Sequence, residues 1–304
     1  MAYLHSDREQ FRDAIDLAYE QTDVMVQAIE KDYYVTMLLR LLAQKMPYIV
    51  FKGGTSLSKC HKVIRRFSED IDITIDTLLS QGQKKKIKQA IVDSAQELGM
   101  TIENLDETRS RRDYNRYVIA YDSVIPMASD ALKAAVLLET SYTAVSFPTV
   151  LLPVHSYIGD MMEQEAPDAI EEYNLNPFEM KVQGIDRTLA DKVFAICDYY
   201  LQGKVAKHSR HLYDIYKLLP LVPQDENFRE LVKEVRAVRA QSVICPSALP
   251  EADVPELLEK IIREKAYKQD YDSLTTQLLE ENVPYDTVIA ALKKVAESSL
   301  FENN

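Results

Sequence analysis

Long apolar runs are missing from this 304-residue chain, although hydrophobic residues make up 46% of it. A helix that crosses a bilayer needs about 18 or more consecutive apolar residues, so the sequence predicts no membrane-spanning helix. The first residues, Met1–Asp7, also lack the basic and apolar regions of a signal peptide. We therefore expect a cytoplasmic protein with enough apolar residues for a substantial core.

Cysteine and glycine are scarce as well, with 3 and 7 copies. Cys60, Cys197 and Cys245 are too widely spaced for a CxxC zinc pattern or a disulfide framework, which is consistent with the cytoplasm. No Gly/Ser-rich linker and no internal repeat interrupts the chain.

Positive charge is in deficit, because the formal net charge is -12. This balance argues against a protein that coats nucleic acid non-specifically, since Lys and Arg drive phosphate binding. It leaves room for a local basic surface. Three basic runs occur: Lys59, Lys62, Arg65 and Arg66; Arg109, Arg111, Arg112 and Arg116; and Lys84–Lys86. Solvated faces are the commoner explanation of such runs.

Hydrophobic periodicity predicts a mixed region followed by a helical one. Helical spacing marks residues 7–45, 55–65 and 80–98. Strands are predicted over 47–52, 70–76, 100–104, 115–122 and 132–142, although the last run also suits a buried helix. Beyond a proline-rich and charged stretch at 150–178, helices are predicted over 186–202, 208–219, 225–240, 254–269 and 284–299, the first with Asp186 as its N-cap. We expect an α/β (α+β) fold with a mixed sheet in residues 1–165 and a helical domain in residues 166–304.

Two neighbouring motifs carry the chemistry. The run Lys52-Gly53-Gly54-Thr55-Ser56 follows an apolar strand, and its glycines allow backbone N–H groups to approach phosphates at the start of a helix. Asp70 and Asp72 then lie two apart in a strand, so their carboxylates share one face. Two close carboxylates repel unless a cation lies between them, and such hard oxygen ligands suit Mg²⁺ or Mn²⁺. An amphipathic surface strand is the simpler alternative; together, however, the motifs predict a site for a metal-bound nucleoside triphosphate.

A two-metal phosphoryl-transfer site usually needs a third carboxylate. Glu139 is our candidate, because it is the one acid inside an otherwise apolar strand, where a buried charge is costly without a metal or cation. Asp76 is the competing candidate, although a residue that ends the strand in a turn explains it more simply.

The helical region adds further candidates. Lys192 lies at the edge of an apolar helix stripe, where a lysine that extends to water is the simple reading. Arg210 and Asp214 are spaced i, i+4, which fits a structural ion pair or a contribution to the nucleotide site. His208 and His211 have helical spacing, but no cysteine or acid completes a zinc set with them.

The motifs Phe51–Ser58 and Arg66–Asp72 resemble those of the AbiEii/AbiGii-type nucleotidyltransferase toxins, a family of abortive-infection and toxin–antitoxin systems. Ile29–Val35, Asp191-Lys192 and Arg210–Asp214 resemble further family segments. The resemblance implies a polymerase-β-like nucleotidyltransferase core, with Lys31 and Asp32 either near the site or bracing the fold. One departure is His211, where many relatives have an acid.

The resemblance also implies roles for the matched residues. Gly53, Gly54 and Thr55 or Ser56 would hold the triphosphate, while Asp70 and Asp72 would bind Mg²⁺. Lys192 would contact phosphate, and Asp214 would be a catalytic or orienting residue. The proton acceptor is left open between Glu139 and Asp214.

The expected reaction moves a nucleoside monophosphate from an NTP onto an acceptor hydroxyl. The resemblance suggests the 3′ end of a tRNA as acceptor and an antitoxin protein as partner, and Arg109–Arg116 is then the expected RNA contact. The alternatives are an enzyme that nucleotidylates protein, and a non-catalytic module that binds nucleotide or a partner.

Overall fold

The computed structural model describes residues 2–22, 24–66, 68, 70–126 and 133–302. They form two compact units. Unit 1 consists of Met1–Cys60 and Glu69–Val182, and unit 2 of His61–Ser68 and Gln183–Asn304. The units are groupings of the folded chain, and a domain boundary after residue 165 stays a prediction.

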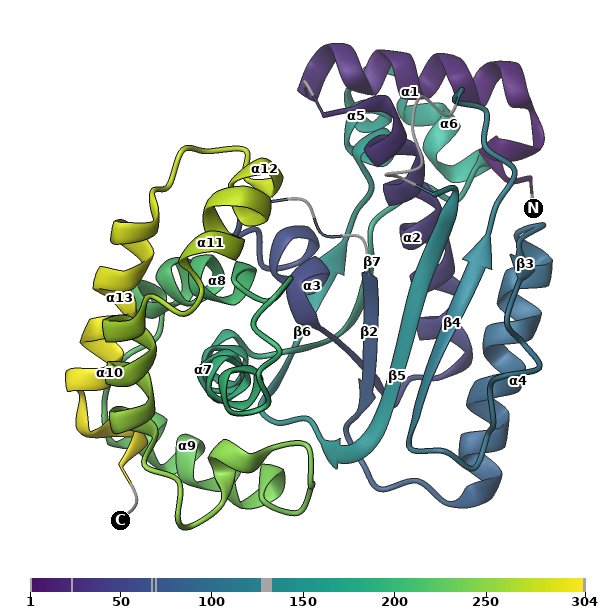
Figure 1. Cartoon of the computed structure of the whole chain (residues 1–304). Coiled ribbons are helices and arrows are strands. Elements are labelled where there is room, and N and C mark those ends of the chain that lie inside the picture. Colours follow the sequence, from purple (N-terminus) through teal and green to yellow (C-terminus); the bar gives the residue numbers. More distant parts are fainter. Residues whose placement is uncertain (1, 23, 67, 69, 127–132, 303–304) are drawn as a thin grey trace. The chain divides into compact units, whose positions relative to one another are not determined.

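Unit 1 is built on a mixed sheet of seven strands in the order β3-β4-β5-β2-β1-β7-β6 (Figure 1). The strands are β1 (Ile49–Lys52), β2 (Asp70–Ile75), β3 (Thr101–Ile102), β4 (Tyr114–Ala120), β5 (Ala135–Val145), β6 (Thr149–Val154) and β7 (Phe178–Gln183). β2 is antiparallel to β1 and parallel to β5, while β4 is antiparallel to β5 and β1 is parallel to β7. The predicted α/β fold with a mixed sheet is confirmed.

Unit 1 also contains helices, some of which pack on this sheet. They are α1 (Arg8–Thr22), α2 (Val26–Lys45), α3 (Gly53–Lys59), α4 (Gln81–Glu97), α5 (Tyr157–Glu165) and α6 (Pro167–Glu172), with a 3₁₀ turn at Leu4–Ser6. α2 packs against α4, α5 and β5, whereas the short α3 packs against β1 and β2. α4 begins at a capping box, in which the Ser80 hydroxyl accepts from the Gln83 backbone and the Gln83 side chain accepts in return from Ser80. None of the described helices is long and apolar enough to cross a membrane.

The alternation in β2 orients the polar side chains that matter below. Ile71, Ile73 and Ile75 are buried, while Asp70 and Asp72 are partly exposed on the other face. Successive side chains of a strand point to opposite faces, so burial of the isoleucines places both carboxylates on one side of the sheet.

Unit 2 is helical, as predicted for the second half of the chain. Its helices are α7 (Ile185–Leu201), α8 (Arg210–Leu218), α9 (Glu226–Arg239), α10 (Val254–Glu264), α11 (Lys268–Asp270), α12 (Thr276–Leu278) and α13 (Tyr285–Glu297). A π-helical turn, Tyr271–Thr275, joins α11 to α12, and short 3₁₀ turns lie at Leu219–Leu221, Pro246–Ala248 and Ser299–Phe301. α8 packs against both α7 and α13.

Several sequence predictions differ from the structure. The helix predicted over 55–65 begins at Gly53 and ends at Lys59, and Arg66 instead forms a β-bridge with Leu279 inside unit 2. Gly184, not Asp186, is the N-cap of α7. Strands β6 and β7 occupy the ends of the 150–178 stretch where no element was predicted; prolines and charges there masked short strands at one side of the sheet. Residue 132, where the last predicted strand begins, lies outside the described residues.

Candidate active site

The glycine motif forms a strand–turn–helix in unit 1. β1 ends at Lys52, and Gly53 turns the chain into α3 with a φ of +82°. A side chain there is strained because L-residues rarely adopt this region. A Cβ on Gly53 would also lie 1.9 Å from Oδ2 of Asp72. The Asp72 carboxylate therefore lies directly against the Cα of Gly53, a contact that no other residue type at position 53 would permit without movement.

Asp72 lies between two charged neighbours across the sheet. Its backbone pairs with Lys52 on β1 and with Glu139 on β5. Neighbouring residues in register share a face of a sheet, so Glu139 of β5 lies on the same face as Asp70 and Asp72 of β2.

Glu139 is less isolated than its apolar strand suggested. Its side chain retains 30% exposure, and its Oε1 lies 3.7 Å from Nε of Arg116, its cross-strand partner on β4. Glu139 therefore has a cationic neighbour, and its role as the third carboxylate stays a prediction. Tyr114, on the same strand as Arg116, has its pKa raised by burial and by the negative charges of Glu139 and Asp72. Burial is the largest cause of this shift, and the two carboxylates add to it.

The two hydroxyl residues of the motif hold the turn together. Oγ1 of Thr55 donates to the Asp70 carbonyl at 2.6 Å, and Oγ of Ser56 donates to the Gly53 carbonyl at 2.9 Å. Both residues are buried. These bonds tie α3 to β2 and fix the glycine turn beside the carboxylates, while a direct phosphate contact by either hydroxyl stays a prediction.

Among the described residues, no group of three His, Cys, Asp or Glu side chains is arranged to hold a metal ion. Asp70 and Asp72 nevertheless offer two hard oxygen ligands on one face. A divalent ion of the Mg²⁺ type is commonly held by one or two carboxylates and completes its shell with water and substrate phosphates. The donor chemistry fits such an ion, and membership of Glu139 in the ligand set stays a prediction.

The second group of predicted residues lies in unit 2. Asp214, on α8, is completely buried, and its carboxylate accepts two hydrogen bonds from Arg66, at 2.7 Å from Nε and 2.9 Å from Nη2. Nζ of Lys192, on α7, lies 2.7 Å from Oδ2 of the same carboxylate. The expected i, i+4 pair with Arg210 is replaced by these two partners, and Lys192 is buried instead of extending to water.

Charge and burial set the protonation of this cluster. Burial by itself would raise the pKa of Asp214, but Arg66 and Lys192 hold it well below its ordinary value. Burial, with Lys192 adding to it, lowers the pKa of His211 to about 3, so its ring is neutral at physiological pH. Nδ1 of His211 lies 3.1 Å from Nζ of Lys192. The neutral ring accepts this hydrogen bond from the ammonium.

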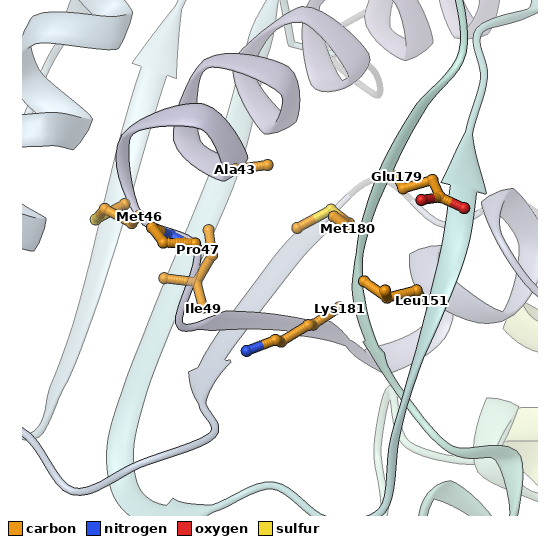
Figure 2. A pocket seen from close by; sticks show the side chains of 8 residues that line it. All are labelled: Ala43, Met46, Pro47, Ile49, Leu151, Glu179, Met180 and Lys181. Atoms are coloured by element: carbon orange, nitrogen blue, oxygen red, sulfur yellow. The ribbon is translucent and has the colours of Figure 1, made fainter.

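Two other sequence candidates have structural explanations. Asp32 forms an ion pair with Lys59 and accepts from the backbone N–H of Tyr157 at 3.0 Å, so it braces α2, α3 and α5. Asp76, the alternative third acid, forms an ion pair with Lys181 of β7. Lys181 lines a cavity of about 250 Å³ with seven other residues, none of them a predicted site residue (Figure 2).

Arg66 is the participant that sequence reasoning missed. It was noted as part of a basic run, whereas its partner lies 148 positions later. The signal available in the sequence was its place in the motif that ends in Asp70-Ile71-Asp72. Phe67 and Glu69 of that motif lie outside the described residues.

Comparison with known proteins agrees with this arrangement. The family model described as "Nucleotidyl transferase AbiEii toxin, Type IV TA system" matches residues 36–293. MenT4, a nucleotidyltransferase toxin from Mycobacterium tuberculosis H37Rv, has a similar fold, with a TM-score of 0.50 and 16% identity over 96% of this chain and 88% of that chain. No curated protein matches the sequence. Since the family model covers most of the chain, the protein belongs to the AbiEii family of nucleotidyltransferase toxins of type IV toxin–antitoxin systems.

Proposed function

We propose that this nucleotidyltransferase uses Mg²⁺ to transfer a nucleoside monophosphate from an NTP onto the 3′ end of a tRNA, and that Asp70 and Asp72 hold the metal. The observation that carries the proposal is the contact between the Asp72 carboxylate and the Gly53 turn. The acid that we assign to the metal lies directly against the turn that we assign to the triphosphate, which supports a shared site for the two.

The residues of unit 1 would act by positioning and by electrostatic stabilisation. Asp70 and Asp72 present their oxygens on one face, and the Gly53 turn beside them would bring the backbone of α3 to a triphosphate. The bound ion would supply charge neutralisation on the triphosphate oxygens. Lys52, in register with Asp72, adds a positive charge on the neighbouring strand.

Unit 2 would contribute a phosphate contact through Lys192. The cluster contains two cations, Arg66 and Lys192, and one anion, Asp214, while His211 is neutral. Lys192 shares the Asp214 carboxylate with Arg66, and its contact with His211 is to an uncharged ring. A buried cation that shares its counter-ion favours an anionic ligand, so Lys192 is suited to a phosphate.

The tRNA acceptor is supported by the distribution of charge. The acidic surplus of the chain falls in unit 1, whereas unit 2 has nearly as many Lys and Arg as Asp and Glu. In unit 1, Arg109, Arg111, Arg112 and Arg116 are all exposed in and before β4. An RNA would meet less repulsion at these two places than the net charge of the whole chain suggests.

The test is to incubate the purified protein with each labelled NTP and MgCl₂, together with total RNA or with lysate protein. We expect label in the tRNA fraction and none with the Asp70→Asn/Asp72→Asn double variant. Label on protein that depends on the same acids would identify the rival protein-nucleotidylating enzyme. Label in neither fraction, with NTP still bound, would refute the proposed reaction.

A further inference from the structure

Arg66, Lys192, His211 and Asp214 form a cluster in unit 2, which we call the Lys192 cluster. The proposed reaction gives no role to His211. His211 lies on α8 one turn before Asp214, and its side chain is 13% exposed. Its Nδ1 lies 3.1 Å from Nζ of Lys192 but 3.9 Å from Oδ2 of Asp214, so the close contact is with the lysine. The longer separation is beyond hydrogen-bond range.

Two of the three N–H bonds of the Lys192 ammonium already have acceptors within the protein. An ammonium has three N–H donors. One is directed at the Asp214 carboxylate at 2.7 Å and a second at the His211 ring at 3.1 Å. Arg66 holds the carboxylate itself through two bonds, which prevents it from rotating away from the lysine. One N–H remains for a further acceptor.

The ring of His211 is also held in place. It is nearly parallel to the ring of Tyr199 on α7, with an interplanar angle of 3° and a centroid separation of 5.8 Å, and Tyr199 in turn stacks on His208 at 3.5 Å. The stack restrains the plane of the imidazole, in which Nδ1 faces Lys192.

We propose that His211 is a positioning residue, which accepts one N–H of Lys192 on an uncharged ring and so presents the ammonium as a phosphate-binding cation. The inference rests on the proposed phosphate contact of Lys192. A neutral acceptor at position 211 aims the lysine without cancelling its charge. An acid there would aim it equally well but would add a negative charge beside Lys192, which opposes the approach of a phosphate.

The charged groups around the ring are consistent with this role. Lys192 faces it from α7, Asp214 and Arg210 from α8, and Arg66 from the segment 61–68. Burial and the nearby Lys192 lower the pKa of His211 to about 3, so the ring stays an acceptor across the physiological range. Burial also lowers the pKa of Lys192, and an acceptor that bonds the ammonium form opposes that shift.

Three substitutions at position 211 distinguish two effects, the orientation of the Lys192 ammonium and the charge next to it. His211→Asn places an amide oxygen close to where Nδ1 lies and keeps a neutral acceptor. His211→Leu removes the acceptor, and His211→Asp supplies an acceptor with a negative charge. The probe is inorganic tripolyphosphate, titrated calorimetrically into the full-length protein, with a short single-stranded RNA as a second arm that tells triphosphate from phosphodiester.

We expect His211→Asn to bind tripolyphosphate within about twofold of the wild type, because it preserves a hydrogen bond to a charged group. His211→Leu should bind about tenfold more weakly, the equivalent of losing one such bond. His211→Asp should bind at least about tenfold more weakly at pH 8, because its carboxylate adds a negative charge beside the lysine. A merely structural defect would weaken His211→Asn as well.

The fall of tripolyphosphate affinity at alkaline pH, where Lys192 loses its proton, gives a second readout. Affinity should fall at lower pH in His211→Leu than in the wild type, because the lysine loses an acceptor that stabilises its charged form. Equal affinities across all three variants, or an Asn variant as weak as the Leu variant, would overturn the proposal. So would a Lys192→Met variant that binds tripolyphosphate as the wild type does.

The proposed function can fail separately. If the wild type labels no RNA but the tripolyphosphate affinities of the His211 variants follow the expected order, the transfer reaction is refuted and the role of His211 is supported. If RNA is labelled and the series is flat, only the role of His211 falls. Should His211→Leu fail to fold, the comparison of His211→Asn with His211→Asp still decides the matter.

Discussion

Replacement of Gly53 by alanine should separate the catalytic arrangement of unit 1 from its stability. The added Cβ would lie 1.9 Å from Oδ2 and 2.9 Å from Cγ of Asp72. Non-bonded carbon and oxygen rarely approach within about 3 Å, so the carboxylate oxygen must move away by about 1 Å or the turn must open. Either response displaces the acid that we assign to the metal.

The size of the effect follows from that displacement. Misplacing a reacting group by about 1 Å costs on the order of a hundredfold in rate. The positive φ of +82° adds a backbone penalty of about 1–2 kcal/mol for any residue with a Cβ. We therefore expect Gly53→Ala to fold with slightly reduced stability and to lose about 99% of its nucleotide transfer.

Gly99→Ala is the matched control. Gly99 also lies in unit 1 and has a φ of +65°, but nothing lies within 4 Å of the position its Cβ would take. Its substitution should carry the backbone penalty of about 1–2 kcal/mol and leave transfer intact. Urea denaturation measures the stability of both variants, and incorporation of labelled nucleotide measures their activity. A Gly53→Ala protein as active as Gly99→Ala would refute the link between the glycine and Asp72.

Three further results are expected. Arg66→Met should destabilise the protein by about 3–5 kcal/mol in urea denaturation, because it removes one partner of a fully buried carboxylate, that of Asp214; a change below about 1 kcal/mol would contradict this. Stability should fall as the pH drops from 6.5 towards 3, by up to about 1.4 kcal/mol per pH unit, because the unfolded His211 takes up a proton that the folded ring refuses. His211→Asn should flatten this slope, and an unchanged slope would assign it to other groups. Replacing exposed Arg111 and Arg112 by glutamine should weaken RNA binding and reduce its dependence on salt, as measured by fluorescence anisotropy; an unaltered salt slope would exclude these arginines from the contact.

The parts of the site that could be predicted from the sequence are those that local patterns determine. Alternation of isoleucine with aspartate placed Asp70 and Asp72 on one face of β2, because a strand repeats every two residues. The acid inside an apolar run pointed to Glu139, which lies in register with Asp72, and its role in the site stays a prediction. These features depend on a few consecutive residues and on the fold class.

The parts that could not be predicted depend on contacts between distant segments. The glycines were interpreted as room for phosphates, whereas the structure adds a second reason at Gly53, which arises only from the register of β1 with β2. Arg66 seemed to belong with a basic surface run, but it is buried against Asp214. No periodicity within either segment encodes that pairing, because the two residues meet only when segment 61–68 joins the helices of unit 2.

The contrast between the acids of the two units bears on the proton acceptor that the sequence left open between Glu139 and Asp214. A general base works best with a pKa near the operating pH. The pKa of Asp214 is held well below its ordinary value by Arg66 and Lys192, and both oxygens of its carboxylate already accept hydrogen bonds. Taking a proton would break the pairing that keeps two buried cations in place. Asp214 is therefore suited to orienting Lys192 rather than to accepting a proton. Glu139, 30% exposed and 3.7 Å from one arginine, keeps an oxygen accessible and is the better candidate of the two.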